Sequence, residues 1–202
     1  MRDRDALAFA IDLGVAMQLT NICRDVLEDA QNGRVYLPAH RLEAVGVRPE
    51  QLVAGTASRE AVAEVTLQIL EQAERYYHSA WLGMRFLPWR ARLAILVAAR
   101  VYRQIGRQLQ RAGGDALAGR TVVSTGRKLF EAALATLNFF SPSVLGIGRS
   151  RPHDAALHIH LRGLPGTHSE RDHHGVLDQD GVGNDRHSKE YADRMGAPIR
   201  AR

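Results

Sequence analysis

The chain has 202 residues, of which 45% are hydrophobic, so it can bury a sizeable core as one domain with or without a tail. Arg and Lys together number 27 and Asp and Glu 22, which gives a net charge of +5 at pH 7. A single cysteine, Cys23, excludes an internal disulfide framework and a multi-cysteine zinc site. No apolar run approaches the ~18–20 residues of a membrane-spanning helix, and no signal peptide is evident.

The first part of the chain shows the hydrophobic periodicity of helices, and no segment alternates with period two for long enough to form a strand. Asn32 and Gly33 are a strong stop signal, and Ser58 is a candidate N-cap. The predicted fold class is all-α, with long helices joined by short links. The predicted helices cover residues 6–29, 42–45, 49–53, 61–86, 89–109 and 128–137.

Residues 141–202 have a different composition, with seven of the nine histidines and almost no periodic apolar pattern. Such a segment cannot bury enough apolar surface to offset its ordering entropy, so we expect a disordered or low-order tail. The pairs His158–His160 and His173–His174 suggest metal binding, but they lack a third ligand and a framework to hold them. The alternative is an out-of-frame C-terminus beginning near Gly148, which the DNA sequence across that codon tests.

One stretch of the first helix is chemically unusual, because four polar side chains share an arc of roughly 80° at about 100° per residue. Burying such a stripe is costly, and two carboxylates one turn apart repel each other. A divalent cation removes both penalties, and Mg²⁺ prefers oxygen ligands and substrate phosphates. The stripe therefore predicts metal-assisted departure of diphosphate, and the alternative is a solvated face paired with arginines. The four residues are Gln18, Asn21, Asp25 and Asp29.

The sequence DLGVAMQLTNICRDVLED over residues 12–29, followed by GRVYLP over 33–38, resembles the second aspartate-rich region of the squalene/phytoene synthase family. Within the family, the motif looks most like that of bacterial phytoene synthases. The segments AARVYRQIG over 98–106 and RTVVS over 120–124 resemble later parts of the family. The resemblance covers roughly residues 5–140. It implies an isoprenoid-synthase helical bundle that joins two prenyl diphosphates, geranylgeranyl or farnesyl diphosphate, head to head in carotenoid or terpenoid biosynthesis.

The resemblance also implies roles for the polar stripe. By resemblance, Asp25 and Asp29 hold Mg²⁺, for which Mn²⁺ is a possible substitute, bridged to the substrate diphosphate. Gln18 and Asn21 line the same site. Arg24 lies next to the motif and is expected to help bind the substrate.

Two residues outside the first helix join the expected site by the same resemblance. Tyr102 would contact the substrate or its diphosphate, and the alternative for it is an ordinary packing tyrosine. Arg120 would pair with diphosphate oxygens through its planar guanidinium, and the alternative is a solvated loop residue. Five apolar residues either line a pocket for the prenyl chain or belong to the core: Leu19, Ile22, Val26, Ile69 and Val101.

The family's first aspartate-rich motif is not found in the 202 residues. We therefore expect residues 1–140 to form the C-terminal part of the family's helical domain, in a truncated form that is inactive or nearly so by itself. The alternative function is a non-catalytic half-bundle subunit. Such a subunit would pair with a separate partner chain that supplies the first aspartate-rich motif.

Nucleic acid is not an expected partner, because Arg100, Arg103 and Arg107 are interleaved with apolar residues. The expected location is cytoplasmic, with possible peripheral contact to the membrane. Aromatic residues around Pro88, including Trp89, form an apolar corner that could touch a bilayer. The alternative for this corner is a packed junction between two helices.

Overall fold

The computed structural model describes residues 5–145, 147 and 152–161, and this part of the chain contains helices and no strand. The predicted all-α fold class is therefore confirmed. The long helices are α1 (Asp5–Arg24), α5 (Arg59–Gly83), α6 (Trp89–Arg111) and α7 (Thr125–Phe139). The short α-helices are α2 (Val26–Gln31), α3 (Ala39–Ala44), α4 (Pro49–Val53) and α8 (Pro142–Leu145). Three 3₁₀ turns are η1 (Met84–Phe86), η2 (Ala116–Ala118) and η3 (Ala155–Leu161).

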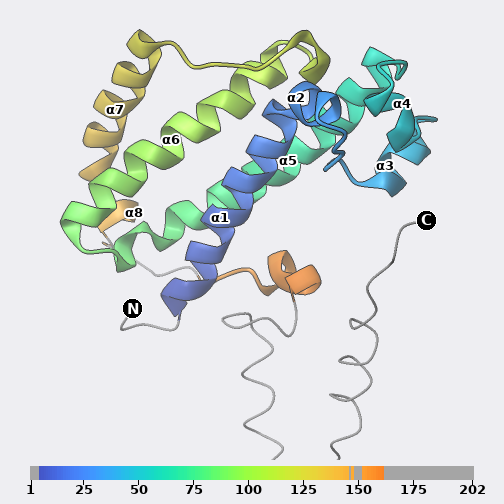
Figure 1. Ribbon diagram of the computed structural model, residues 1–202. Coiled ribbons are helices and arrows are strands. Elements are labelled where there is room, and N and C mark those ends of the chain that lie inside the picture. Colours follow the sequence, from blue (N-terminus) through green and yellow to red (C-terminus); the bar gives the residue numbers. More distant parts are fainter. Residues whose placement is uncertain (1–4, 146, 148–151, 162–202) are drawn as a thin grey trace, which may run out of the picture.

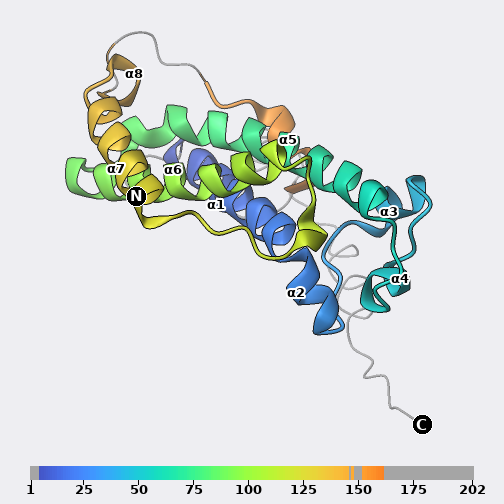
Figure 2. The same cartoon turned by 90° about the horizontal axis from the view of Figure 1, so that it is seen from above.

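The long helices α1, α5 and α6 form the centre of the fold (Figure 1). Helix α1 packs along α5 and also contacts α6, while α7 packs mainly on α6. The short helices α3 and α4 lie at the end of the molecule where α1 gives way to α2, as the view from above also shows (Figure 2). This arrangement leaves one side of α1 without a neighbouring helix in the described part of the chain.

Local chemistry explains several helix boundaries. The Ser58 hydroxyl accepts a hydrogen bond from the backbone N–H of Ala61 at 3.2 Å and caps α5, as predicted. Ser124 caps α7 in the same way, through the N–H of Arg127 at 3.3 Å. The turn after α2 is completed by Gly33, whose φ of +72° is accessible to glycine at no steric cost.

The predicted first helix is interrupted at Asp25, which adopts φ −104° and ψ 12° between α1 and α2. The hydrogen-bonding pattern nevertheless crosses the bend. The N–H of Asp25 donates to the carbonyl of Asn21 at 3.0 Å, and the N–H of Asp29 donates to the carbonyl of Asp25 at 2.8 Å. Asp25 and Asp29 therefore stay one turn apart while the chain changes direction.

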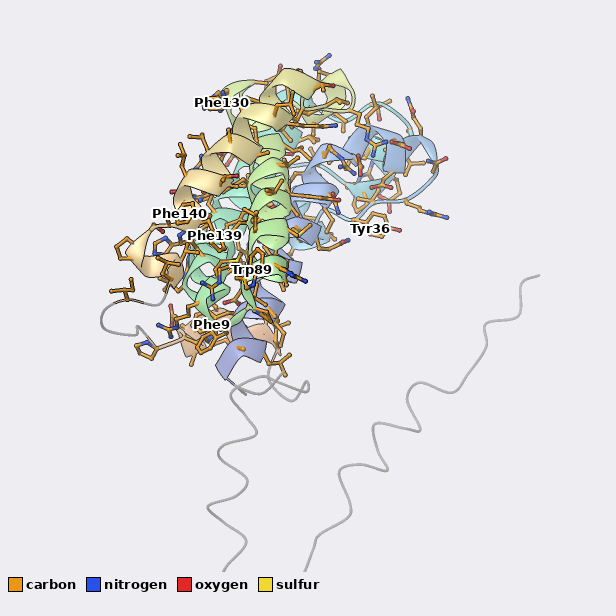
Figure 3. The ribbon with its side chains drawn as sticks, turned by 90° about the vertical axis from the view of Figure 1, so that its left-hand side faces the viewer. Phe9, Tyr36, Trp89, Phe130, Phe139 and Phe140 are labelled. Atoms are coloured by element: carbon orange, nitrogen blue, oxygen red, sulfur yellow. The ribbon has the colours of Figure 1, made fainter. Side chains whose placement is uncertain are left out.

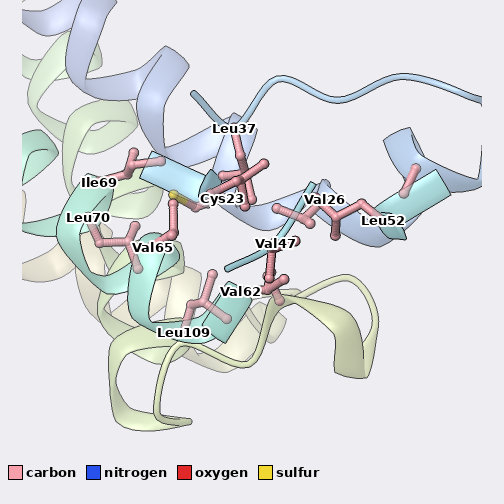
Figure 4. Close-up of a cluster of buried hydrophobic side chains, with 13 residues drawn as sticks. Cys23, Val26, Leu37, Val47, Leu52, Val62, Val65, Ile69, Leu70 and Leu109 are labelled. Atoms are coloured by element: carbon pink, nitrogen blue, oxygen red, sulfur yellow. The ribbon is translucent and has the colours of Figure 1, made fainter. Parts of the chain in front are cut away.

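The largest cluster of buried apolar side chains joins α5 to the end of α1 and to the short helices (Figure 4). Leu42, Val62 and Val65 are fully buried there. Cys23 belongs to the same cluster, and its thiol lies 3.7 Å from the carbonyl oxygen of Thr66. Burial raises the pKa of the Cys23 thiol to about 12, so this cysteine is an inert part of the core.

Gly83 allows α1 and α5 to approach each other closely at the opposite end. A Cβ atom at Gly83 would lie 2.2 Å from Cβ of Phe9, a distance that no pair of carbon atoms tolerates. The Phe9 ring also stacks on Phe86, with centroids 5.8 Å apart. The glycine and the aromatic pair together fix where the start of α1 rests on α5.

The structure differs from the expected low-order tail over the part that it describes. Val144 in α8 is fully buried, and Leu157 in η3 enters the cluster formed by α1 and α5. The hydroxyl of Tyr76 donates to the carbonyl of Leu157 at 2.8 Å. These apolar residues are too widely spaced to form a periodic pattern, which is why the sequence did not reveal their burial. Residues 162–202, which include His173 and His174, lie outside the described residues.

Two parts of the chain bear on the expectations about membranes: the first helix and the corner around Pro88. Ala6–Arg24 is long and apolar enough to cross a bilayer by length and composition, contrary to the reading of the sequence. A central helix of a bundle meets the same criteria, and α1 packs against both α5 and α6. At the corner around Pro88, Trp81 and Leu87 pack against buried residues, whereas Trp89 is 62% exposed (Figure 3).

Candidate functional site

Charged side chains from distant parts of the chain meet at the bend between α1 and α2. The guanidinium of Arg24 holds the Asp25 carboxylate with two hydrogen bonds, of 2.7 Å from Nε to Oδ1 and 2.6 Å from the terminal nitrogen to Oδ2. Nε of Arg120, from the link between η2 and α7, lies 3.3 Å from Oδ1 of the same carboxylate. The hydrogen bonds from Arg24 are the main reason that the pKa of Asp25 is lowered, and both arginines add electrostatic attraction.

On a regular helix Arg24 would point away from the stripe, because successive side chains are about 100° apart. Its long side chain folds back instead, and only 16% of it is exposed. Arg120 also lies 3.6 Å from Glu28, which the sequence analysis did not include in the site. The structure therefore brings two arginines to the carboxylate of Asp25. Arg24 is its neighbour in the sequence, whereas Arg120 lies 95 positions further along the chain.

Asp29 has different surroundings. It is partly buried in a narrow crevice, lined also by Ile22, Arg34 and Tyr36. Burial raises its pKa, and the negative charges of Asp25 and Glu28 act in the same direction against the attraction of Arg34. Asp29 thus carries a negative charge that its protein surroundings compensate incompletely.

The two amide residues of the stripe are not equivalent. Asn21 is partly buried, and its Oδ1 atom is buried without a hydrogen-bond partner in the described part of the chain. Such an orphaned oxygen costs stability unless a ligand satisfies it. Gln18 is exposed, although its apolar context predicts burial, because it lies on the side of α1 that has no neighbouring helix.

Tyr102 approaches the cluster from α6. It is partly buried and packs against the apolar cluster that contains Ala16 and Tyr77. It is also close enough to Arg24 to contribute to the raised pKa of that guanidinium, after the larger effect of the hydrogen bond with Asp25. Tyr102 therefore combines a packing role with a position beside the charged cluster.

The donor set fits a hard divalent cation. Asn21, Asp25 and Asp29 supply one orphaned amide oxygen and two carboxylates at spacings of about one turn, and Mg²⁺ prefers such oxygen ligands. Arg24 and Arg120 supply two guanidinium groups, which match the oxygens of a diphosphate in shape and charge. The arrangement can therefore hold an anion and its counter-cation side by side.

The expected apolar pocket residues divide into two groups. Leu19, Ile22 and Ile69 line a cleft of about 330 Å³ between α1, α3 and α5. Val26 is buried in the largest core cluster, and Val101 is partly buried on α6. Sequence alone could not separate these positions, because the helical period is the same for a pocket wall and a core.

Sequence reasoning did not find the ion pairs between the long helices. Arg103 on α6 makes hydrogen bonds of 2.9 Å and 3.0 Å to the carboxylate of Glu74 on α5, and Arg107 lies 3.8 Å from the same group. Arg100 pairs at 2.8 Å with Glu131, a buried residue of α7. The three arginines therefore face carboxylates, and no local pattern indicated this because each partner comes from another helix.

These observations define an all-α protein with a cluster of acidic and basic side chains at a helix bend. In this cluster two carboxylates lie one turn apart, and two arginines contact one of them. The squalene/phytoene synthase family model matches residues 1–127, which is more than half of the chain, and the chain belongs to this family.

Three relatives illustrate the similarity. A phytoene synthase of Rhodobacter capsulatus is 35% identical over 162 residues, which cover 79% of this chain and 48% of the relative. The 15-cis-phytoene synthase of Enterobacter agglomerans is 46% identical over 129 residues, which cover 64% of this chain and 43% of the relative. The 15-cis-phytoene synthase of Pantoea ananas is 43% identical over 129 residues, which cover 64% of this chain and 41% of the relative. The chain thus spans about half the length of these relatives or somewhat less. An alignment over 79% of the chain must reach about residue 160, beyond the change in composition near Gly148.

Proposed function

We propose that the cluster at the bend binds a divalent cation, Mg²⁺ or Mn²⁺, together with the diphosphate of a prenyl diphosphate. We propose further that the protein takes part in the head-to-head condensation of two prenyl diphosphates in carotenoid or terpenoid biosynthesis. The observation that carries the proposal is the contact of Arg24 and Arg120 with Asp25, one helical turn from Asp29, inside the region that the family model matches. The names of the relatives, all phytoene synthases, support the reaction.

The residues at the bend divide the work of binding. Asp25 and Asp29 would hold the cation, and the orphaned Oδ1 of Asn21 would add a neutral oxygen. When bound, the cation supplies positive charge that stabilises the departing diphosphate. Arg24, which donates two hydrogen bonds to Asp25, and Arg120, which forms an ion pair with it, would turn to the diphosphate oxygens when the substrate binds.

Tyr102 and the open side of α1 would position the rest of the substrate. The Tyr102 side chain packs beside the charged cluster, where it would limit the positions open to the diphosphate. On α1, Ala10 and Gly14 are exposed on the same side as Asn21 and Asp25, by their spacings of three and four residues. These small residues offer an apolar surface for a prenyl chain that leads away from the site.

A second candidate function is a half-bundle subunit that pairs with a separate chain carrying the first aspartate-rich motif. The observation that favours it is the same open side of α1. Leu7, Ala10, Gly14 and Gln18 are all exposed at helical spacing on the most apolar helix of the fold. A helix from another chain would cover this surface and enclose the substrate between the two halves.

The binding proposal is tested by isothermal titration of the chain with inorganic pyrophosphate, with and without MgCl₂. We expect binding that requires Mg²⁺ and that weakens at least about tenfold in Asp25→Asn and Asp29→Asn, since each removes a charged ligand. Glu28→Gln is the matched control, because it removes a 56% exposed carboxylate from the same turn. The proposal would be contradicted if pyrophosphate bound equally well with and without Mg²⁺. It would also be contradicted if the affinity fell equally in all three variants.

The reaction is tested by incubating the chain with Mg²⁺ and either geranylgeranyl or farnesyl diphosphate and extracting the hydrocarbon product. The same assay is repeated after adding the part of the Enterobacter agglomerans enzyme that this chain does not match. Product from the chain alone supports a self-sufficient enzyme, and product only in the mixture supports the half-bundle subunit. Absence of product in both, from a chain that binds Mg²⁺ and pyrophosphate, would contradict the proposed reaction.

A further inference from the structure

A second polar cluster lies at the other end of α1, around a carboxylate that is completely buried. Asp12 has no exposed surface, and two imidazoles of the segment 152–161 contact it. Nε2 of His153 lies 2.7 Å from Oδ2, and Nε2 of His158 lies 2.9 Å from Oδ1. Their side chains are only 3% and 1% exposed. One ligand atom from each of the three residues lies within 4.8 Å of the other two.

We propose that Asp12, His153 and His158 form a Zn²⁺ site. Two imidazole nitrogens and one carboxylate oxygen are a donor set that Zn²⁺ takes in proteins, at ligand distances of about 2.0–2.2 Å. Nitrogen ligands distinguish this site from the all-oxygen cluster at Asp25 and Asp29, because Mg²⁺ prefers oxygen. Asp12 precedes Asp25 by 13 positions, about 20 Å along a helix. The two sites are therefore separate in both position and chemistry.

Packing holds the three ligands in place, as a metal site requires. The rings of His153 and Phe9 are nearly perpendicular, with centroids 5.1 Å apart, and the centroids of the two imidazole rings are 4.4 Å apart. Leu157, beside His158, is buried against α5 and anchored by the hydroxyl of Tyr76. Asp154 caps the following turn, accepting a hydrogen bond from the N–H of Ala156 at 3.0 Å.

The role of the ion follows from where its ligands lie in the sequence. Asp12 and His158 are 146 residues apart, so one ion would tie the end of the described chain to its first helix. An ion that binds the folded chain and not the unfolded one stabilises the fold in proportion to the logarithm of its concentration. The Zn²⁺ would thus be a structural ion that holds residues 152–161 against α1 and α5.

The experiment is a calorimetric titration of the complete chain with ZnCl₂, with the bound metal counted by elemental analysis. We expect one tight Zn²⁺ per chain that is weakened at least about tenfold in His158→Gln and in His153→Gln, since each loses a coordinating nitrogen. His160→Gln is the matched control, because His160 lies in the same 3₁₀ turn and is exposed. Equal binding by His158→Gln and His160→Gln would overturn the proposal and leave Asp12 as a buried hydrogen-bond acceptor only.

Two further measurements keep the test decisive. The titration is repeated with four further histidines of the C-terminal segment changed to glutamine: His168, His173, His174 and His187. The tight site should persist in this variant. If a His158 or His153 variant does not fold, Co²⁺ is added to the unmodified chain and to His160→Gln. We expect the visible absorption of four-coordinate Co²⁺ in both, displaced by one equivalent of Zn²⁺. A colourless Co²⁺ titration would overturn the proposal.

Discussion

Asp25 and Asp29 lie one helical turn apart, yet their surroundings shift their pKa values in opposite directions. The guanidinium of Arg24 lowers the pKa of Asp25, whereas burial and the neighbouring carboxylates raise the pKa of Asp29. The charged form is therefore stabilised by folding at Asp25 and destabilised at Asp29. A cation between the two carboxylates would neutralise the charge of Asp29. The stability of this turn would then depend on whether the cation is bound.

Asp29→Asn should stabilise the metal-free chain while it weakens Mg²⁺–pyrophosphate binding. A carboxylate whose folded pKa is raised costs stability when it is ionised, so the gain at pH 7 should be about 0.2–0.5 kcal/mol, as for like charges at i and i+4. The gain should shrink as the pH falls through the raised pKa toward the ordinary value of 3.8. Urea unfolding of both chains between pH 7 and pH 4 measures it, and a less stable variant at pH 7 would contradict it.

Asp25→Asn should have the opposite effect on stability. Its lowered pKa means that the ionised form contributes stability above the ordinary value of 3.8, and that this contribution is lost as the pH falls through the lowered pKa. We expect a loss of up to about 1 kcal/mol at pH 7, the range of a partly exposed ion pair. The same unfolding series measures it, and the two variants should differ in sign at neutral pH.

The residue scale also shows what a sequence can and cannot reveal. The stripe from Gln18 to Asp29 was visible because helical periodicity is local, and the turn after the bend preserves it. The sequence instead paired His158 with its neighbour His160. The structure pairs His158 with Asp12 and brings His153 to the same carboxylate. Contacts across more than 140 residues leave no local pattern, so no reading of spacing could have found them.

At the scale of elements, boundaries set by local chemistry were predicted well and those set by packing were not. Ser58 and Gly33 mark a helix start and a turn through their own hydrogen bonding and backbone freedom. The bend at Asp25 was missed, because helical hydrogen bonds continue across it and nothing in the adjacent sequence breaks the pattern. The 3₁₀ turn η3 was missed because its order depends on contacts with α1 and α5.

The contact between α1 and α5 gives a prediction from two helical glycines. Gly83→Ala should destabilise the fold by about 1–3 kcal/mol, because the added Cβ meets Phe9 at 2.2 Å and one helix must move. Gly14→Ala is the matched control. It lies in a helix with nothing within 4 Å of the added atom, so it should stabilise the fold by about 0.5–1 kcal/mol. Thermal unfolding measures both, and equal shifts would show that α1 and α5 do not meet as described.

At the scale of the whole molecule, several large exposed apolar side chains lie on α7 or just after it, and another, Trp89, lies at the corner near Pro88 (Figure 3). Trp89 is 62% exposed, with the guanidinium of Arg90 5.1 Å from its ring centroid. An aromatic ring beside basic groups suits the surface of an anionic bilayer.

Trp89→Glu should therefore reduce co-sedimentation with vesicles of anionic lipid at least about threefold, because it replaces an amphipathic anchor with a repelled charge. Val53→Glu is the control, since Val53 is an exposed apolar residue of α4, in another part of the molecule. An equal loss in both variants would indicate a general effect of charge, and no loss in either would show that Trp89 does not contact the bilayer.

The open side of α1 is the surface to which we propose that a prenyl chain or a partner helix binds. Gly14 lies on this side, 11 residues before Asp25, which is about 16 Å along the helix. Gly14→Trp should therefore leave pyrophosphate binding with Mg²⁺ unchanged, while the indole occupies the surface that a partner helix and a prenyl chain would share. When the chain is mixed with the unmatched part of the Enterobacter agglomerans enzyme, we expect product formation to fall at least about tenfold, since overpacking a close interface costs several kcal/mol.

Gly126 on α7 provides the matched substitution, because it is also an exposed helical glycine with nothing within 4 Å of an added Cβ. Gly126→Trp should leave product formation near its original level, since α7 lies on the far side of α6 from α1. Equal activity of the Gly14 and Gly126 variants would show that the open side of α1 is neither an interface nor part of the substrate site. Loss of pyrophosphate binding in the Gly14 variant alone would instead show that α1 transmits a change along its length to the bend. The pair of variants thus separates the proposed binding of Mg²⁺ and pyrophosphate at the bend from the proposed enclosure of the substrate along α1.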